Sequence, residues 1–233
     1  MATNPDPAKN KPPMFTPFKL RGLELINRVV MSPLCMYSAE DGVVGDWHVV
    51  HLGSRAIGGA GLIFAEMTAV HPDGRISLRD AGIWNDKHTA PWKRVVDFVH
   101  EHTDSKIGIQ LGHAGRKADT GLSWERGTDA QMEYGFDIIA PTAIPVSERA
   151  RTPRVITDQE IIALPGLYKD AAERAQEAGF DALNFHCAHG YLMSSFISPL
   201  SNHRNDKYGG PLENRMRLPL DVFAEIRKAW PGD

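Results

Sequence analysis

Four short apolar runs recur along the chain, each bounded by glycine, proline or polar residues. They are RVVMSPL (28–34), GLIFAEM (61–67), KIGIQL (106–111) and DALNF (181–185). Each is too short for a typical helix, and such bounded apolar runs are typical of buried strands. The pattern therefore predicts four strands with little exposed surface.

Helical patterns fall between these runs. Residues 48–59 and 87–102 carry apolar side chains at three- and four-residue spacing. Strands that alternate with helices indicate a parallel sheet with right-handed crossovers. We therefore predict an α/β fold.

The third crossover has the clearest helix signals. Thr157 and Glu160 form a capping-box pattern, and Gly179 stands where a C-terminal cap glycine belongs. One face of the expected helix is small: Ala171, Ala172, Ala175 and Ala178. Pro165 falls inside the pattern, so we expect a kink or a restart there.

A fourth helix is expected from Pro211 to Trp230, bent or restarted at Pro219. Between the third strand and its helix, residues 116–156 are rich in glycine, proline and charge. An excursion of this length in a compact domain is usually a functional lid or a subdomain.

Composition excludes several classes of protein. The 233 residues carry a net charge of −3, which gives no basic surface for nucleic acid or an anionic membrane. No apolar run approaches the roughly 20 residues that span a bilayer, and the N-terminus lacks a secretory signal. The two cysteines, Cys35 and Cys187, show no disulfide or zinc spacing. We expect a cytoplasmic protein with reduced thiols.

Polar or redox-capable side chains collect after all four apolar runs. Cys35 and Tyr37 follow the first run, and Glu66 lies at the end of the second. The third run is followed by GHAGRK, and the fourth by HCAHGY. In parallel α/β folds, sites are built at the carboxyl ends of the strands. The sequence thus predicts a functional site at this edge, although each residue could also be structural. Glu66, for example, could be an acid or a supporting hydrogen-bonding group.

The pair His186 and His189 admits three kinds of chemistry. Zinc is one, but no carboxylate or third histidine stands at ligand spacing, so we expect no metal. A Cys35 nucleophile activated by a histidine is another, without a legible third orienting residue. The third is two imidazole N–H groups holding one carbonyl oxygen, with Tyr191 as proton donor. That set fits reduction of a C=C bond conjugated to a carbonyl.

Three longer motifs resemble one family. FTPFKLRGLELINRVVMSPLCMYS, IGIQLGHAGRKA and HCAHGYLMSSFISPLSNHRNDKYGGPLENR are similar to the old yellow enzymes, in their cysteine-containing bacterial branch. The resemblance covers about residues 15–230. It implies a flavin-dependent ene-reductase on a parallel (β/α)8 TIM barrel, of which this chain holds about the first four β/α units.

The resemblance also implies a cofactor site. The cofactor is FMN, with NADPH or NADH as hydride donor. The residues implied to contact the flavin are Ser32, Pro33, Leu34, Cys35, Met67 and Gln110. Cys35 would tune the flavin potential, and Gln110 would bond its pyrimidine edge.

The catalytic and substrate-binding residues follow in the same way. His186 and His189 would hold the substrate carbonyl oxygen, and Tyr191 would donate a proton to the substrate. Tyr37 and Tyr191 would line the substrate side. The implied reaction passes a hydride from NAD(P)H through the flavin to the C=C bond of an α,β-unsaturated carbonyl compound.

The chain holds four of the eight strands that such a barrel needs. We therefore expect residues 15–233 to be the N-terminal half of a barrel and residues 1–14 a flexible arm or linker. The phosphate-binding loops of the family fall outside this sequence. One alternative is the reductase half of a bifunctional aryl-coenzyme A monooxygenase of the 2-aminobenzoyl- or salicylyl-coenzyme A type. Another is an inactive, truncated remnant. A homo-oligomer is a further possibility.

Overall fold

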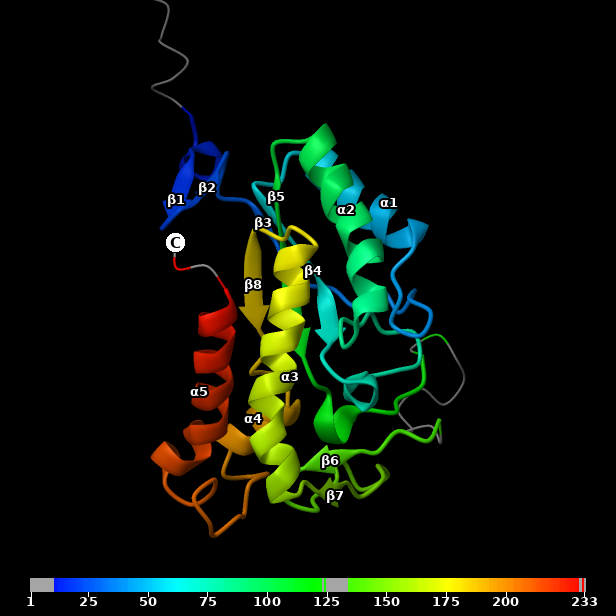
Figure 1. The fold of residues 1–233 in the computed structure, drawn as a ribbon, viewed down its shortest axis with the longest axis vertical. Coiled ribbons are helices and arrows are strands. Elements are labelled where there is room, and N and C mark those ends of the chain that lie inside the picture. Colours follow the sequence, from blue (N-terminus) through cyan, green and yellow to red (C-terminus); the bar gives the residue numbers. More distant parts are fainter. Residues whose placement is uncertain (1–10, 123, 125–133, 231, 233) are drawn as a thin grey trace, which may run out of the picture.

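A four-stranded sheet forms the centre of the chain in the computed structural model (Figure 1). The structure describes residues 11–122, 124, 134–230 and 232. The sheet order is β3-β4-β5-β8, and all neighbouring strands are parallel. The strands are β3 (Val30–Met31), β4 (Leu62–Ala69), β5 (Lys106–Gly112) and β8 (Ala182–Phe185). Each overlaps one of the four apolar runs, so the predicted strands and their parallel pairing are confirmed. The predicted burial is wrong for β3, whose Val30 is 47% exposed, and for β8, which is only partly buried, because these two strands form the edges of the sheet.

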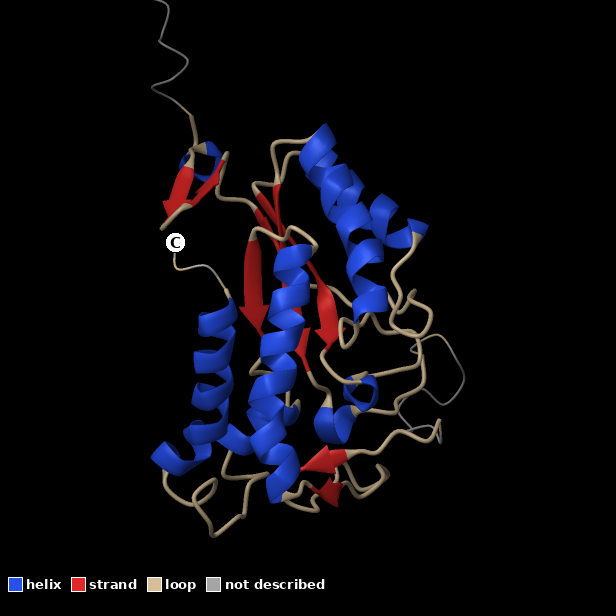
Figure 2. Ribbon diagram, viewed as in Figure 1, coloured by secondary structure: helices blue, strands red, loops and turns tan. Residues whose placement is uncertain are grey.

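Helices follow these strands along the chain, as Figure 2 shows. They are α1 (Asp46–Ile57), α2 (Thr89–His102), α3 (Asp158–Glu177), α4 (Leu192–Ile197) and α5 (Leu212–Ala229). Helix α1 packs on α2, and α3 packs on α5. The expected helices are confirmed with small shifts, since α1 begins at 46 rather than 48 and α2 at 89 rather than 87. The short helix α4 has no counterpart in the sequence prediction.

Helix α3 begins and ends as its sequence predicts. The Glu160 N–H donates to Thr157 Oγ1 at 3.2 Å, and the Thr157 N–H donates to Glu160 Oε2 at 2.8 Å. After the helix, Gly179 has φ +92°, which suits a glycine cap. The sequence predicts a kink or a restart at Pro165 and at Pro219, and the restart is wrong at both, because α3 and α5 continue through these prolines. Packing of the two helices on each other and on the sheet outweighs the lost helical bond, a cost of about 3 kcal/mol.

Smaller elements lie around this framework. An antiparallel hairpin joins β1 (Phe18–Leu20) to β2 (Leu23–Leu25), and a parallel pair joins β6 (Ile139–Ala140) to β7 (Arg154–Val155). The 3-10 helices are η1 (Pro13–Phe15), η2 (Pro72–Gly74), η3 (Asp86–His88) and η4 (Gly115–Lys117). The predicted 116–156 excursion thus holds η4, β6 and β7, while 123 and 125–133 lie outside the described residues. Residues 1–10 of the predicted arm also lie outside them.

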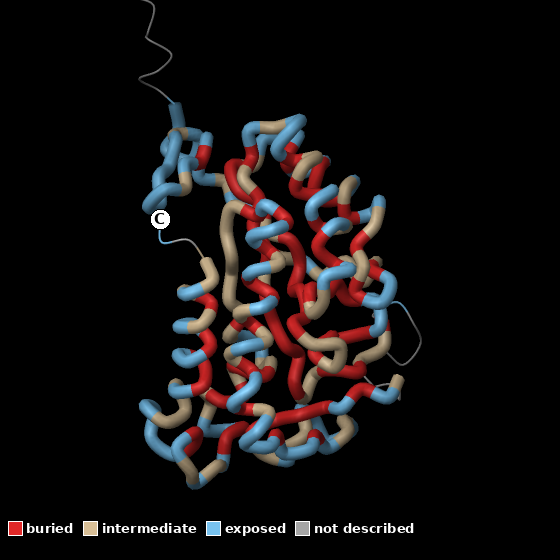
Figure 3. The backbone as a smooth tube through the Cα atoms, in the orientation of Figure 1, coloured by how far each residue is buried: buried red, intermediate tan, exposed pale blue. Residues whose placement is uncertain are grey.

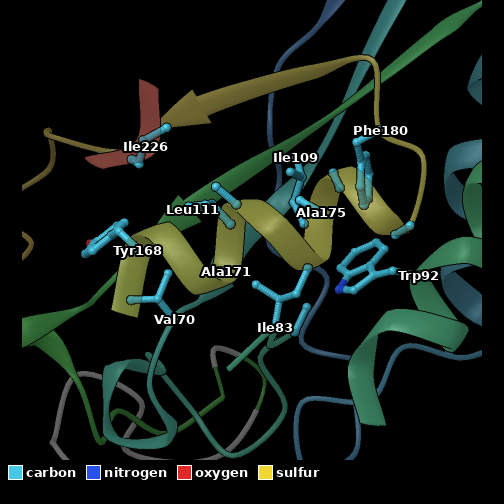
Figure 4. Close-up of a cluster of buried hydrophobic side chains, with 14 of the residues drawn as sticks. Val70, Ile83, Trp92, Ile109, Leu111, Tyr168, Ala171, Ala175, Phe180 and Ile226 are labelled. Atoms are coloured by element: carbon cyan, nitrogen blue, oxygen red, sulfur yellow. The ribbon is translucent and has the colours of Figure 1, made fainter. Parts of the chain in front are cut away.

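The core lies between the sheet and helices α2 and α3 (Figure 4). Tyr168, Ala171 and Ala175 of α3 face the sheet, where Ile109 and Leu111 are fully buried. The alanines leave room for the helix backbone to approach the strands closely. Truncating one of these large buried side chains typically lowers the free energy of unfolding by about 2–5 kcal/mol. This tightly packed core holds the strands, and with them the strand ends, in fixed positions.

Strand β8 lies at one edge of the sheet. Its four residues are only partly buried, in contrast to β4 and most of β5 (Figure 3). A groove of about 350 Å³ runs beside it, lined by Leu183 and Phe185 of the strand and by Phe223 and Trp230 of the α5 region. An edge strand with such an apolar flank is a surface onto which further elements of a fold can pack.

Candidate active site

The predicted site residues lie at or beyond the carboxyl ends of the parallel strands. Cys35 and Tyr37 follow β3, and Met67 and Gln110 lie in β4 and β5. His186, His189 and Tyr191 follow β8 and precede α4. The carboxyl ends of parallel strands meet at one edge, so the fold carries residues from four distant segments to the same side of the sheet.

Three aromatic rings converge after β8. The His186 ring centroid lies 5.0 Å from that of His189 and 4.8 Å from that of Tyr191, and both pairs meet edge to face. The third pair, His189 and Tyr191, is 6.4 Å apart. His186 is buried and His189 is exposed. The three polar ring edges therefore share one small region that is open on the His189 side.

The backbone fixes which nitrogen of His186 can donate. The Ala188 N–H donates to His186 Nδ1 at 3.3 Å, so Nδ1 is an acceptor and the ring proton lies on Nε2. Burial, helped by the neighbouring His189, lowers the pKa of His186 to about 4. At neutral pH the ring is therefore uncharged and carries an Nε2–H donor.

The His189 turn has an unusual backbone. His189 has φ +59° and Gly190 has φ +74°, and the Tyr191 N–H donates to the Ala188 carbonyl at 3.2 Å. The left-handed region is unfavourable for a residue with a Cβ, by about 1–2 kcal/mol. Such conformations gather at functional sites, where surrounding contacts hold them.

Cys35 and Tyr37 join the same region through an apolar cluster. Together with Tyr191 they pack against Met67. Other buried members of this cluster are Ile76, Ala114, Ala118, Phe136 and Ile138. The structure thus brings together side chains from beyond β3 and β8, which lie on opposite edges of the sheet.

The ionisation of Cys35 bears on its chemistry. Burial raises the pKa of the Cys35 thiol to about 12, with smaller contributions from the carboxyl groups of Asp80 and Glu66. A thiolate is the nucleophilic form of cysteine, so a thiol with this pKa is a poor nucleophile at neutral pH. This electrostatic setting disfavours the alternative of nucleophilic catalysis by Cys35.

A polar row crosses the sheet near its carboxyl end. Met67 pairs with Gln110 across β4 and β5, and Gln110 pairs with Asn184 across β5 and β8. The Gln110 amide donates to Asn184 Oδ1 at 2.9 Å. Asn184 was missed by the sequence analysis, because its role depends on strand register, which local pattern does not give.

The segment after β3 is only loosely covered by protein. Ser32 is exposed, Pro33 is partly buried, and Leu34 is 58% exposed. Strand β3 keeps only two residues of the first apolar run, since its pairing with β4 ends at Met31 and Ile63. The predicted longer strand over 28–34 is wrong in that respect. The chain leaves the sheet there and presents these residues at its edge.

His113, by contrast, has a structural setting. It is 3% exposed, its Nδ1 accepts the Gly115 N–H at 3.1 Å, and its carbonyl accepts the Leu192 N–H. Burial lowers the pKa of His113 to about 3. These contacts tie β5 to the start of α4 and indicate a structural role for His113.

Two buried carboxyl groups lie beside the site. Asp80 accepts hydrogen bonds from the Ile76 N–H at 2.7 Å and the Ser77 hydroxyl at 2.8 Å, and burial raises the pKa of Asp80 to about 7. Glu66 contacts His48 and the Met36 backbone. Asp80 and His48 were both missed, because neither stands near the predicted strand ends in sequence.

The described part of the chain contains no group of three or more His, Cys, Asp and Glu side chains placed to hold a metal ion. Among its helices, none is both long and apolar enough to cross a membrane.

Comparison with known proteins identifies the family. A sequence profile described as the NADH:flavin oxidoreductase / NADH oxidase family matches residues 13–232. The chain belongs to this family. It is 47% identical over 221 residues to an NADPH dehydrogenase of Geobacillus sp. (strain WCH70), and 45% identical to one of Bacillus subtilis (strain 168). Each match covers 94% of this chain and 61% of the relative, so the chain spans about three-fifths of these proteins' length.

Solved structures agree with the family assignment. Morphinone reductase in complex with tetrahydroNAD matches with a TM-score of 0.83 and 34% identity, over 94% of this chain and 61% of that one. The Old Yellow Enzyme from a Pichia species matches with a TM-score of 0.83 and 33% identity, over 93% and 56%. The predicted resemblance and the predicted fold class, the first β/α units of a TIM barrel, are confirmed.

Proposed function

We propose that this chain is the N-terminal part of an FMN-dependent ene-reductase that uses NADPH or NADH. The observation that carries the proposal is the convergence of His186, His189 and Tyr191 beside the cluster that holds Cys35 and Tyr37. The substrate class is an α,β-unsaturated carbonyl compound. The names of the relatives support the nicotinamide donor, since those cited are NADPH dehydrogenases.

The residues at the strand ends fit a flavin ring. Leu34 offers an exposed apolar face and Ser32 an exposed hydroxyl, while Gln110 supplies an amide in the row beside them. The Cys35 thiol would contact the ring, and Met67, which is 2% exposed, would support this surface from the buried cluster. When bound, FMN supplies the hydride that is added to the substrate β-carbon.

The imidazoles would bind the substrate carbonyl. His186 presents its Nε2–H in a neutral ring, and His189 stands 5.0 Å away between ring centroids. Two N–H donors on one oxygen stabilise the negative charge that develops there when the β-carbon receives a hydride. The neutral ring of His186 suits this task because it can hold the oxygen without protonating it.

Tyr191 would provide the proton for the α-carbon. Burial raises the pKa of the Tyr191 phenol above its ordinary value, so its O–H stays protonated at neutral pH. Its ring lies 4.8 Å from that of His186, so the donor stands beside the proposed carbonyl site. Tyr37 would line the same side of the substrate.

The alternative of an aryl-coenzyme A monooxygenase half has no support from the relatives cited above. These relatives are named as NADPH dehydrogenases, morphinone reductase and Old Yellow Enzyme. A small carbonyl substrate is therefore the better proposal.

The test uses a chimera, because the chain spans 61% of its relatives. Residues 13–232 replace the matching segment of the Bacillus subtilis NADPH dehydrogenase, and Tyr191→Phe is introduced. Enone turnover should fall by about 10²–10⁴-fold, the usual contribution of a positioned acid. The rate at which NADPH reduces the bound flavin, measured by stopped flow, should equal that of the parent chimera.

A matched control is Tyr168→Phe. That hydroxyl is buried in the core, and it finds no hydrogen-bond partner within the described residues, so its removal should leave turnover unchanged. Equal turnover in the Tyr191→Phe chimera and the parent would contradict the assigned role of Tyr191.

A further inference from the structure

A buried carboxyl group lies under the segment that carries Cys35 and Tyr37. Glu66 is 4% exposed, and its Oε2 accepts a hydrogen bond from the Met36 N–H. Met36 stands between the two site residues in sequence. Glu66 therefore holds the backbone at Met36, the residue that joins Cys35 to Tyr37.

His48 completes the arrangement. Its Nδ1 accepts the Gly45 N–H at 3.2 Å, which places the ring proton on Nε2, and that nitrogen lies 2.9 Å from Glu66 Oε1. His48 thus donates to Glu66 and is itself 1% exposed. Each carboxyl oxygen of Glu66 has one donor, and the histidine links it to the start of α1.

The strand that carries Glu66 is irregular at this point. The pairing of β4 with β5 shifts register between Phe64 and Met67, a span that includes Glu66. The Thr68 hydroxyl donates to the Glu66 carbonyl at 2.9 Å. Bulges of this kind redirect side chains next to functional sites. Here the irregularity accompanies a carboxyl group that reaches the neighbouring segment beyond β3.

The segment that Glu66 contacts needs support from outside. No described strand pairing continues from Met31 to Ala39, and Tyr37 has φ +50°, which is unfavourable for a residue with a Cβ. Within the segment, the Ser38 hydroxyl donates to the Met36 carbonyl at 2.9 Å. Contacts to other parts of the chain include the Ala39 N–H, which donates to the Arg79 carbonyl, and a hydrogen bond between the Cys35 thiol and the Met67 backbone. Glu66 supplies the anchor for the Met36 N–H.

We propose that Glu66 and His48 are positioning residues that hold Cys35 and Tyr37 in place through the Met36 amide. Their importance for the reaction rests on the proposed function, whereas their hold on the segment rests on the geometry alone. Nothing in this role requires either side chain to touch a substrate.

The hydrogen-bond pattern demands a carboxylate at this position. In Glu66→Gln, the amide oxygen could still accept the Met36 N–H. The amide NH₂ would then face the Nε2–H of His48, and two donors cannot form a hydrogen bond with each other. A switch of the His48 proton to Nδ1 would instead set that proton against the Gly45 N–H. One hydrogen bond must be lost in either case, although the side chain keeps its size.

Alkylation of the two cysteines by iodoacetamide tests the proposal on this chain without cofactor or substrate. Both Cys35 and Cys187 are free and partly buried, and peptide mass spectrometry reports both rates from one sample. Glu66→Gln should raise the rate ratio of Cys35 to Cys187 by about tenfold, because the Glu66 charge helps to raise the pKa of the Cys35 thiol and its removal favours the reactive thiolate. Loosening of the segment acts in the same direction.

His48 variants separate position from charge. His48→Ala keeps the carboxylate but removes its donor, so a raised ratio there reports the loosened segment alone. His48→Gln can still donate to Glu66 and should keep a ratio near that of the parent chain. In the parent chain itself, the Met36 amide should exchange slowly with deuterium.

Asp181→Asn is the matched control. Asp181 Oδ2 accepts the Ile107 N–H at 2.9 Å and lies 2.8 Å from His100 Nε2, so a carboxyl group at the other end of the sheet also joins a backbone amide to a histidine, although both contacts there meet one oxygen. Asp181→Asn should leave the ratio of the Cys35 and Cys187 alkylation rates unchanged. An unchanged ratio in Glu66→Gln, equal acceleration of both cysteines, or fast exchange of the Met36 amide would overturn the proposal. Because the assay uses no flavin or enone, such a failure is distinct from failure of the proposed function.

Discussion

The two ends of the parallel sheet use the same polar device in different surroundings. At the carboxyl end, Glu66 and His48 bond each other with side chains only 3% and 2% exposed. At the amino end, Asp181 and His100 are 15% and 36% exposed, and Lys106 lies 3.4 Å from the same carboxyl group. The Glu66–His48 pair is almost fully buried, and it supports the segment in which Tyr37 has a positive φ. The second is partly solvated and joins a helix to regular strands.

Backbone strain follows the same division. Five non-glycine residues in the described chain have positive φ: Arg21, Tyr37, Asp41, Asp119 and His189. All except Arg21, which lies in the β1–β2 turn, occur in the loops that follow the parallel strands. The amino end thus consists mainly of regular elements, while the carboxyl end holds conformations that cost stability, as is common next to functional sites.

The largest effect is expected when both imidazoles at the carboxyl end of the sheet are removed. In the chimera, His186→Ala combined with His189→Ala should weaken binding of a phenol such as 4-hydroxybenzaldehyde by roughly 3–6 kcal/mol, at about 1.5–3 kcal/mol for each lost bond to a charged oxygen. Titration of the long-wavelength charge-transfer band between phenolate and flavin measures this. Flavin content should stay normal, and a band that persists at unchanged phenol concentrations would show that the imidazoles do not hold the ligand oxygen.

Much of this framework was predictable, and the limits have a physical cause. The four strands, α2, α3 and the convergence of His186 with Tyr191 follow from local apolar runs and from the rule for parallel strands. The pairs Glu66–Met36 and Gln110–Asn184 depend on contacts across 30 and 74 positions, which no local pattern encodes.

Prolines and short elements mark the other limit. Local propensity breaks a helix at Pro165, yet tertiary packing keeps α3 whole. Strands of two or three residues, such as β6 and the hairpin strands, carry too little periodicity to be recognised. The roles assigned to individual site residues stay predictions.

A smaller effect is expected on the free energy of unfolding when the two histidine–carboxylate pairs are compared. Glu66→Gln leaves a buried donor without an acceptor and should lower the free energy of unfolding by about 1–3 kcal/mol. Asp181→Asn concerns a partly exposed pair and should cost about 1 kcal/mol or less, because water replaces the lost interaction. Urea denaturation of this chain measures both, and an equal loss in the two variants would remove the distinction between the ends.

The proposed carbonyl site depends on a neutral His186 with its proton on Nε2. Imidazole ¹⁵N resonances of this chain, recorded from pH 7 to pH 3, report this state. We expect an Nε2–H tautomer at pH 7 and titration near pH 4, because burial and His189 disfavour the charged ring. Since an unfolded histidine titrates near pH 6.5, the native state binds fewer protons between these values, and stability should fall as the pH drops from about 6.5 toward 4. Titration of His186 near pH 6.5, or an Nδ1–H tautomer at pH 7, would contradict the account.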